Sequence, residues 1–257
     1  MQIRNPQGRL IKRNLRLLVR NRRRIRNPDM IILVRHGEAT HHTEHFTGGW
    51  TDSNLTDKGR RQIEAAAEKL AKDFSGKMPC FRILCSDLKR AHESAVIFAE
   101  KLGIEKVEDF AFLREKNNGK AAGLKESEAR SIYCPPPTLK ELDHRNYPGG
   151  ETRREFFRRS VDGLHEAADW DKENLIIISH KGTIQNIIFD WLGMDIEDVN
   201  RLNFSVDILP SSLSVLGINK WKEHAIFRLN DLSHLQAQEG YGIHKFKLGA
   251  IDALYQK

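Results

Sequence analysis

MIILVRHG, residues 30–37, joins a continuous apolar run to an arginine, a histidine and a glycine. An apolar run such as Met30 to Val34 is typical of a strand buried on both faces, as in a parallel sheet. Short apolar runs at residues 81–85, 107–113 and 175–179 repeat this pattern. We therefore expect these four segments to be strands of one mostly parallel sheet.

Helical segments lie between the predicted strands. Thr56 can cap a helix whose small and apolar residues at positions 63, 66, 67 and 70 share one face, and Ser86 or Asp87 can cap the next helix. Helical periodicity also marks residues 152–170 and the segment from Gly182 through 191. Strands that alternate with helices predict a three-layer α/β/α sandwich with a mostly parallel central sheet.

The same pattern predicts where domains begin and end. We expect one catalytic domain over residues 30–234, with a small cap insertion at about 121–150, where prolines and glycines interrupt regular structure. Residues 235–257 are expected to be a C-terminal tail, and residues 1–29 a basic N-terminal extension.

The positive charge of the chain is concentrated in that extension. Residues 1–29 hold nine arginines and one lysine against a single acid, whereas residues 30–257 hold 32 basic and 34 acidic residues. The segment is therefore open to three interpretations: an arm that binds nucleic acid or anionic lipid, a transit peptide, or an unstructured extension upstream of a natural start at Met30. We favour the last, because blocks of like charge usually stay solvated.

The composition excludes several classes of protein. Apolar runs are too short for a membrane span, so we expect no transmembrane segment. Three cysteines, Cys80, Cys85 and Cys134, form neither an even set nor a paired metal-binding motif. This argues against a disulfide framework and a structural zinc site, and favours a reducing cytoplasm. The sequence does not indicate an oligomeric state.

Charged residues follow the predicted strands at the ends where parallel sheets bind ligands. Arg35 and His36 follow the first strand, Arg90 lies early in the helix after the second, Glu115 follows the third, and His180 follows the fourth. Since these strand ends lie on one edge of the sheet, we expect the five side chains to converge.

This set of side chains suits phosphoryl transfer through a phosphorylated histidine. A neutral imidazole is a competent nucleophile near pH 7, and two arginines can hold a dianionic phosphate in planar forks. His180 adds a further donor, and Glu115 can protonate the leaving alkoxide and later accept a proton from water. Charged side chains fill every role, so we expect no metal and no cofactor. The expected partner is a small-molecule phosphate ester.

Several motifs in order resemble the histidine phosphatase superfamily, which has the phosphoglycerate mutase-like fold. The resemblance covers about residues 30–234 and implies that His36 is the phosphorylated nucleophile. The motifs that carry it are Leu33-Val34-Arg35-His36-Gly37-Glu38-Ala39-Thr40, Asp52 with Leu55-Thr56 and Gly59, Cys85-Ser86-Asp87-Leu88-Lys89-Arg90-Ala91, Leu113-Arg114-Glu115, Pro148-Gly149-Gly150-Glu151, Ser179-His180-Lys181-Gly182 and Arg228-Leu229-Asn230-Asp231.

The same resemblance suggests substrate-binding residues. His42 stands where many members carry a phosphate-binding asparagine, so it is a candidate phosphate ligand. Gly48 and Gly49 of the first loop and Lys181 beside the second histidine are further candidates. One departure bears on specificity: residues 120–122, Lys-Ala-Ala, replace the aromatic and acidic residues that members commonly carry.

Some residues remain open to two interpretations. His41, His42 and His45 beside Glu44 could form a metal site, although the same loop is implicated in phosphate binding. Cys85 fits a small core residue better than a nucleophile. Trp50 can be a wall of the substrate site or a packing residue.

The activity is expected to be that of a phosphatase. Mutases of this family resemble one another in a long insertion between the acid and the second histidine, whereas 64 residues separate Glu115 from His180 here. An Arg-His-Tyr sequence that follows the acid in those mutases is replaced by Lys116-Asn117-Asn118. The alternatives are mutase-type phosphoryl transfer and a non-catalytic phosphate-binding scaffold. The complete set of charged residues argues against the scaffold.

Overall fold

The computed structural model describes residues 30–75, 77–138, 141–170, 172–203 and 205–235. Our expectations for the basic segment 1–29, and for all but the first residue of the tail 235–257, lie outside these ranges.

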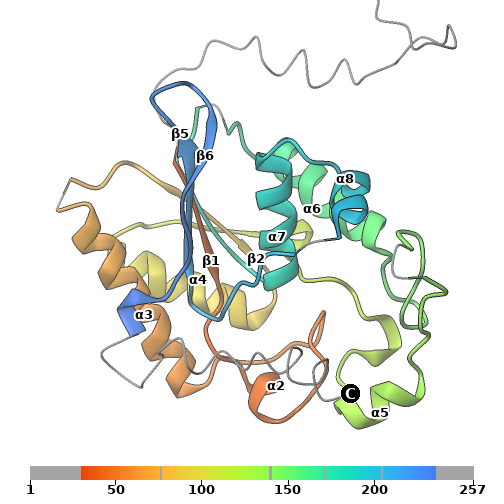
Figure 1. The fold of residues 1–257 in the computed structure, drawn as a ribbon. Helices are drawn as coiled ribbons and strands as arrows, with labels where there is room; N and C mark the ends of the chain where they lie inside the picture. Colours follow the sequence, from red (N-terminus) through yellow and green to blue (C-terminus); the bar gives the residue numbers. More distant parts are fainter. Residues whose placement is uncertain (1–29, 76, 139–140, 171, 204, 236–257) are drawn as a thin grey trace, which may run out of the picture.

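A six-stranded sheet forms the centre of the molecule (Figure 1). Four strands, in the order β3-β2-β4-β1, run parallel to one another, and β5 and β6 extend the sheet beyond β1 as antiparallel neighbours. The strands are β1 (Ile31–Arg35), β2 (Arg82–Ser86), β3 (Val107–Phe110), β4 (Leu175–Ser179), β5 (Leu213–Ile218) and β6 (His224–Asp231).

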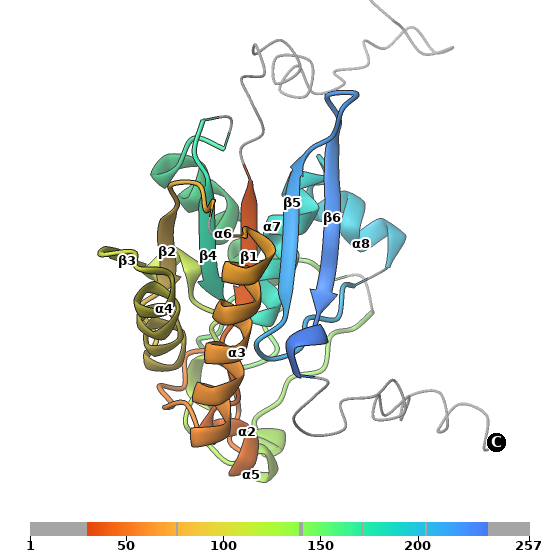
Figure 2. The same ribbon diagram turned by 90° about the vertical axis from the view of Figure 1, so that its left-hand side faces the viewer.

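Helices cover both faces of this sheet (Figure 2). On one face lie α3 (Asp57–Asp73) and α4 (Lys89–Leu102), and on the other lie α6 (Arg153–Ala167), α7 (Lys181–Trp191) and α8 (Ile196–Leu202). The predicted three-layer sandwich is confirmed. Shorter helices are α2 (Thr40–Thr43), α5 (Glu126–Ser131), η1 (Ala111–Leu113), η2 (Gly119–Ala121) and η3 (Ser233–Leu235).

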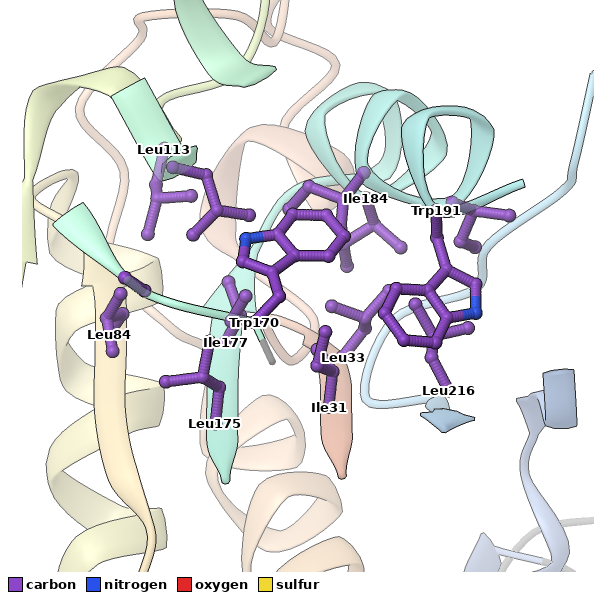
Figure 3. Packing of buried hydrophobic residues seen from close by; sticks show 14 of the residues in the cluster. Ile31, Leu33, Leu84, Leu113, Trp170, Leu175, Ile177, Ile184, Trp191 and Leu216 are labelled. Carbon is purple, nitrogen blue, oxygen red and sulfur yellow. The ribbon is translucent and has the colours of Figure 1, made fainter. Parts of the chain in front are cut away.

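Strand β1 divides the core because its side chains alternate between the two faces of the sheet. Ile32 and Val34 pack against α3 and α4, whereas Ile31 and Leu33 belong to the cluster under α6 and α7. Figure 3 shows this second cluster, in which Trp170 and Trp191 join the strand residues. Apolar layers on both sides fix the strand, and so fix where its last residues point.

The functional end of the sheet is the end at which β1 terminates. Figure 1 shows α2 and α5 at this end, and α5 belongs to the predicted cap segment at about 121–150.

Two local predictions were wrong. The third strand ends at Phe110, and residues 111–113 form η1, so Glu115 follows a 3-10 turn rather than a strand. The N-cap of α4 is Leu88, not Ser86 or Asp87. Ser86 is still part of β2, and its Oγ accepts a hydrogen bond from the backbone N of Leu88 at 3.3 Å. Asp87 forms an ion pair with Arg114 instead.

Other local predictions were right. The Oγ1 of Thr56 accepts from the N of Gly59 at 3.0 Å, as expected of a cap. Strand β4 has the predicted bounds, and α7 begins one residue before Gly182, at Lys181, and ends at Trp191 as expected.

Candidate active site

The structure brings together the five site residues predicted from the strand ends. Arg35 is the last residue of β1, His36 follows it, Arg90 is the second residue of α4, and His180 is the N-cap of α7. Nε of Arg90 lies 3.3 Å from Nε2 of His36, and the rings of His36 and His180 are 5.0 Å apart. Glu115 lies on the segment after η1 and approaches the start of α7.

His36 is held in one orientation and one tautomer. Its backbone N donates to the carbonyl of Ser179 at 3.0 Å, which fixes it beside β4. Its Nδ1 lies 2.8 Å from the carbonyl oxygen of Gly37. A carbonyl only accepts, so Nδ1 carries the proton and Nε2 presents a lone pair. Burial, then the charges of Arg90 and other neighbours, holds the pKa of His36 well below its usual range, so the ring is neutral.

Arg90 is buried, and three of its five N–H groups are hydrogen bonded, one of them from Nε to Nε2 of His36. Its Nη1 donates to the carbonyl of Thr51 at 2.6 Å, and its Nη2 donates to the carbonyl of Gly49 at 2.8 Å. Burial lowers its pKa to about 10, so the guanidinium remains charged at neutral pH. The predicted substrate residue Gly49 thus holds Arg90. It has a φ of +70°, and a Cβ there would lie 2.7 Å from the carbonyl oxygen of Lys116.

The side chains of Arg35 and His42 are in contact. Nη1 of Arg35 donates to the carbonyl of Ile208 at 2.6 Å, and Nη2 lies 3.2 Å from Nε2 of His42. The backbone N of Ala39 lies 3.1 Å from Nδ1 of His42, so both ring nitrogens meet a group that can only donate. Burial lowers the pKa of His42 to about 4, with Arg35 and Arg90 contributing. The neutral ring accepts at only one nitrogen, so one of these two N–H groups lacks an acceptor in this ring.

His180 is oriented by a residue that sequence reasoning considered only as a helix cap. Its Nε2 lies 2.9 Å from Oγ of Ser86, and its Nδ1 is buried without a hydrogen-bond partner in the protein. Ser86 Oγ accepts from Leu88, so its own proton is free to be donated to Nε2. The second lone pair of Oγ can equally accept from Nε2, so the contact fixes the orientation of the His180 ring and leaves Nδ1 available to a bound group.

Glu115 is held at the entrance of α7 through its carboxylate. Oε2 accepts from the backbone N of Gly182 at 3.0 Å, and Oε1 accepts from the backbone N of Lys116 at 2.8 Å. A Cβ at Gly182 would lie 2.4 Å from Oε1, so only glycine leaves room for the carboxylate here.

Arg159 of α6 braces the segment that carries Glu115. Its Nη1 donates to the carbonyl of Phe112 at 2.9 Å, and its Nη2 donates to the carbonyl of Glu115 at 3.1 Å. An ion pair with Glu151 holds the guanidinium at 2.6 Å. Nε1 of Trp50 donates to the same Glu115 carbonyl at 2.7 Å, so the indole supports this segment. No sequence motif identified Arg159, because its contacts are to backbone carbonyls distant along the chain.

Two glycines let the loop after β1 lie against α3. A Cβ at Gly37 would lie 2.4 Å from the carbonyl oxygen of Gly59, and a Cβ at Gly59 would lie 2.0 Å from that of Glu38. Real Cβ contacts are not this short, so the approach needs glycine at both positions.

The remaining predicted residues lie at the margins of this pocket. Lys181 forms an ion pair with Asp207 and is half exposed, and Gly48 lies beside the His41 ring. Nδ1 of His41 lies 2.7 Å from Oγ of Ser53. Within the described ranges, His41, His42 and His45 do not form a compact group of metal ligands; such a group occurs at Cys85.

The fold and this cluster of side chains place a neutral, buried histidine beside two arginines at the end of a parallel sheet. The model of the histidine phosphatase superfamily (branch 1) matches residues 31–231, and the chain belongs to this family. The resemblance drawn from the motifs, and the class of phosphate-ester chemistry expected from them, are confirmed.

Curated relatives and solved structures agree with this assignment. Phosphoglycerate mutase-like protein 4 of Arabidopsis thaliana is 30% identical over 82% of this chain and 91% of its own length. A metal-independent phosphoserine phosphatase of the same plant is 29% identical over 80% of this chain and 83% of its own. A mycobacterial glucosyl-3-phosphoglycerate phosphatase, solved in complex with VO₃, has a TM-score of 0.61 and 25% identity, covering 79% of this chain and 99% of its own.

Within the residues that the structure describes, no helix is long and apolar enough to cross a membrane.

Proposed function

We propose that this chain hydrolyses a small phosphorylated metabolite through a phosphohistidine on His36. The observation that carries the proposal is a neutral histidine that lies near buried nitrogen atoms without hydrogen-bond partners. Nε2 of His36 has a lone pair, which accepts from Nε of Arg90, and the buried Nε of Arg35 and Nδ1 of His180 have no hydrogen-bond partner among the described residues. A phosphate group supplies the missing acceptor oxygens.

The first step transfers the phosphoryl group to the enzyme. Nε2 of His36 forms a bond to phosphorus while the ester P–O bond breaks, and the departing oxygen takes a proton from protonated Glu115. Charge that develops on the phosphoryl oxygens is stabilised by the two guanidinium groups and the histidine N–H donors. Nδ1–H of His36 stays bonded to the Gly37 carbonyl, which stabilises the ring as it acquires charge.

The second step returns the enzyme to its starting state. Glu115, now ionised, accepts a proton from water, and the water oxygen attacks phosphorus. The P–N bond breaks, its electron pair returns to Nε2, and inorganic phosphate leaves. Side chains of this chain fill every role, so we propose a metal-independent phosphatase.

The contacts divide the predicted site residues by role. His36 is proposed as nucleophile, Glu115 as acid and base, and Arg35, Arg90 and His180 as the groups that hold the phosphoryl oxygens. His42 is proposed as a further phosphate ligand, since its Nε2 lies 3.2 Å from Nη2 of Arg35 and its ring stacks on that of His36 at 5.7 Å. Gly49 supports binding by holding Arg90, while Gly48 and Lys181 stay predicted substrate contacts at the margin.

A phosphatase is favoured over a mutase by the segment between the acid and the second histidine. This segment has 64 residues and lacks a long insertion. The names of the relatives include both activities, a phosphoserine phosphatase and a mutase-like protein, so both must be assayed. A non-catalytic phosphate-binding scaffold would not need an acid such as Glu115, whose carboxylate is held by the backbone N of Gly182. This contact favours an enzyme over a scaffold.

The domain and compartment are proposed on the same basis. We assign activity to residues 30–234, with residues of about 121–150 as the cap, supported by the family match over 31–231. A cytoplasmic location is proposed because Cys80, Cys85 and Cys134 are all free thiols.

One experiment tests this function directly. Purified protein would be incubated with a panel of phosphate monoesters, including phosphoserine and phosphoglycerates, while phosphate release and phosphoglycerate isomerisation are measured together. Chelator in every assay tests metal independence. We expect release to exceed isomerisation with several esters, and isomerisation faster than release would assign a mutase. Absence of both reactions on every ester would contradict an enzymatic role.

A further inference from the structure

A second group of ligand-type side chains lies toward the β3 edge of the sheet. It consists of Cys85 of β2, His92 of α4 and Asp109 of β3, and one ligand atom of each lies within 4.8 Å of the other two. In the described part of the chain these residues contribute nothing to the phosphate pocket. We propose that they form a binding site for a thiophilic divalent cation of the zinc class.

The sheet register explains why the cysteine and the carboxylate lie together. Cys85 and Asp109 are paired positions on neighbouring parallel strands, so their side chains project from the same face. Sγ of Cys85 donates to Oδ1 of Asp109 at 3.0 Å, and Nδ1 of His92 lies 2.7 Å from the same oxygen. Helix α4 places His92 over this face, so three elements each supply one ligand.

Sulfur, nitrogen and oxygen are the ligand types that zinc prefers. Zinc binds them at about 2.0–2.3 Å with tetrahedral geometry, which separates neighbouring ligand atoms by roughly 3.3–3.6 Å. The contacts of 2.7 and 3.0 Å must therefore open by less than about 1 Å. His92 and Asp109 have the freedom to do so, because their side chains are 46% and 40% exposed.

Because the side chains of His92 and Asp109 are partly exposed, a cation can reach the site from solvent and take a water molecule as its fourth ligand. Cys85 is buried beneath the two exposed side chains, so a cation entering from solvent meets His92 and Asp109 first and keeps a water on its outer side. On binding, the Sγ–H proton of Cys85 passes to solvent and a metal–sulfur bond takes its place. The cysteine spacing in the sequence could not reveal this site, because its ligands lie on three separate elements.

Cobalt is the probe that distinguishes this site from the histidine-rich pocket. Bound Co²⁺ gives a thiolate-to-metal charge-transfer absorption only where a cysteine is a ligand, and the phosphate pocket contains none. We expect full-length protein to show this absorption, Zn²⁺ to displace it, and Zn²⁺ to raise the melting temperature through binding to the folded state. Cys80→Ser and Cys134→Ser, at exposed thiols, are matched controls that should keep all three properties.

Three variants complete the test. Cys85→Ser should lose the charge-transfer absorption. His92→Gln and Asp109→Asn alter exposed side chains, so they should fold and bind Zn²⁺ more weakly by at least the roughly 10-fold loss typical of an outer-shell partner. Phosphatase activity without added metal should be retained in both. An absent absorption in the wild-type chain, its persistence in Cys85→Ser, or unchanged zinc affinity in His92→Gln and Asp109→Asn would overturn the proposal.

Discussion

Nη2 of Arg35 lies 3.2 Å from Nε2 of His42, while the backbone N of Ala39 lies 3.1 Å from Nδ1 of the same ring. Both neighbours can only donate and a neutral ring accepts at one nitrogen, so one N–H group lacks an acceptor, which an anionic oxygen would supply. This contact motivates a test of His42 as a phosphate ligand.

His42→Ala should weaken binding of phosphate esters and of inorganic phosphate. A hydrogen bond to a charged group contributes about 1.5–3 kcal/mol, so we expect KM and the inhibition constant of phosphate to rise about 10- to 100-fold. His42→Asn restores a short N–H donor and should recover part of the affinity. Steady-state kinetics with phosphate as inhibitor checks this. Equal constants in wild type and His42→Ala would remove His42 from the site.

His36→Ala should abolish both turnover and covalent labelling, because no other side chain is placed as the nucleophile. Rapid acid-free quenching after incubation with a labelled ester should trap a phosphoramidate in the wild-type chain that is stable in alkali and labile in acid. His41→Ala is a useful control, since that neighbouring histidine should not be the labelled residue. Phosphoserine in the trapped protein would exclude the proposed intermediate.

Glu115→Gln should slow hydrolysis of an alkyl ester by about 10² to 10⁴, since the amide keeps the shape but cannot donate the proton. An aryl phosphate with a good leaving group needs less protonation and should lose less in its first step. The measurement is the ratio of rates with the two esters, using the burst of aryl alcohol release for the second. A uniform loss would assign Glu115 to positioning.

Stability should fall as the pH falls below neutrality. Buried histidines are held neutral in the folded state: the pKa of His41 is lowered to about 2 and that of His42 to about 4, mainly by burial. Unfolded histidines titrate near 6.5, so below this pH the unfolded chain binds more protons. The free energy of unfolding then decreases by up to about 1.4 kcal/mol per pH unit for each such histidine.

Urea unfolding between pH 7 and pH 5 tests this linkage, because most carboxylates stay ionised over that range. His41→Gln removes one of the titrating groups and should flatten the dependence. A slope identical to that of the wild-type chain would show that His41 does not contribute to it.

Deleting residues 1–29 should leave turnover and melting temperature unchanged, because the predicted site lies beyond them. The net charge of the remaining residues 30–257 is −2, compared with +7 for the whole chain. Any binding to DNA or to vesicles of anionic lipid should disappear with the segment. Assays of activity, melting temperature and salt-dependent binding on both chains separate these properties. A large loss of turnover would show that the segment supports the domain.

The central part of the fold was predictable because its strands are buried on both faces. Residues 30–34 and 175–178 are continuous apolar runs, and the arginine and histidines that follow them could be placed at one edge of the sheet. Neither β5 nor β6 was predicted: β5 is a buried apolar strand that the four predicted strands did not include, and charged residues interrupt the pattern of β6. The third strand was predicted too long, because Phe112 and Leu113 continue an apolar run that the chain uses for a 3-10 turn.

The site was predictable as a set of residues but not as a geometry. The positions of the strand ends predicted that Arg35, His36 and His180 lie close together. The hydrogen-bond partners of these side chains, such as Ser86 for His180, lie far along the chain and could not be predicted from the sequence pattern. Arg159 was missed for the same reason, since its partners are backbone carbonyls that no side-chain pattern encodes.

Gly37 and Gly59 allow two backbone segments to lie in direct contact, and this limits which substitutions the protein tolerates at either position. The loop that follows β1 lies so close to α3 that neither glycine has room for a methyl group. A Cβ at Gly59 would lie only 2.0 Å from the carbonyl oxygen of Glu38. Because His36 precedes Gly37, we expect an alanine at either glycine to displace the proposed nucleophile, although neither glycine is itself a predicted catalytic residue. Mutational tolerance around this pocket is therefore set by contact between two backbones as well as by chemistry.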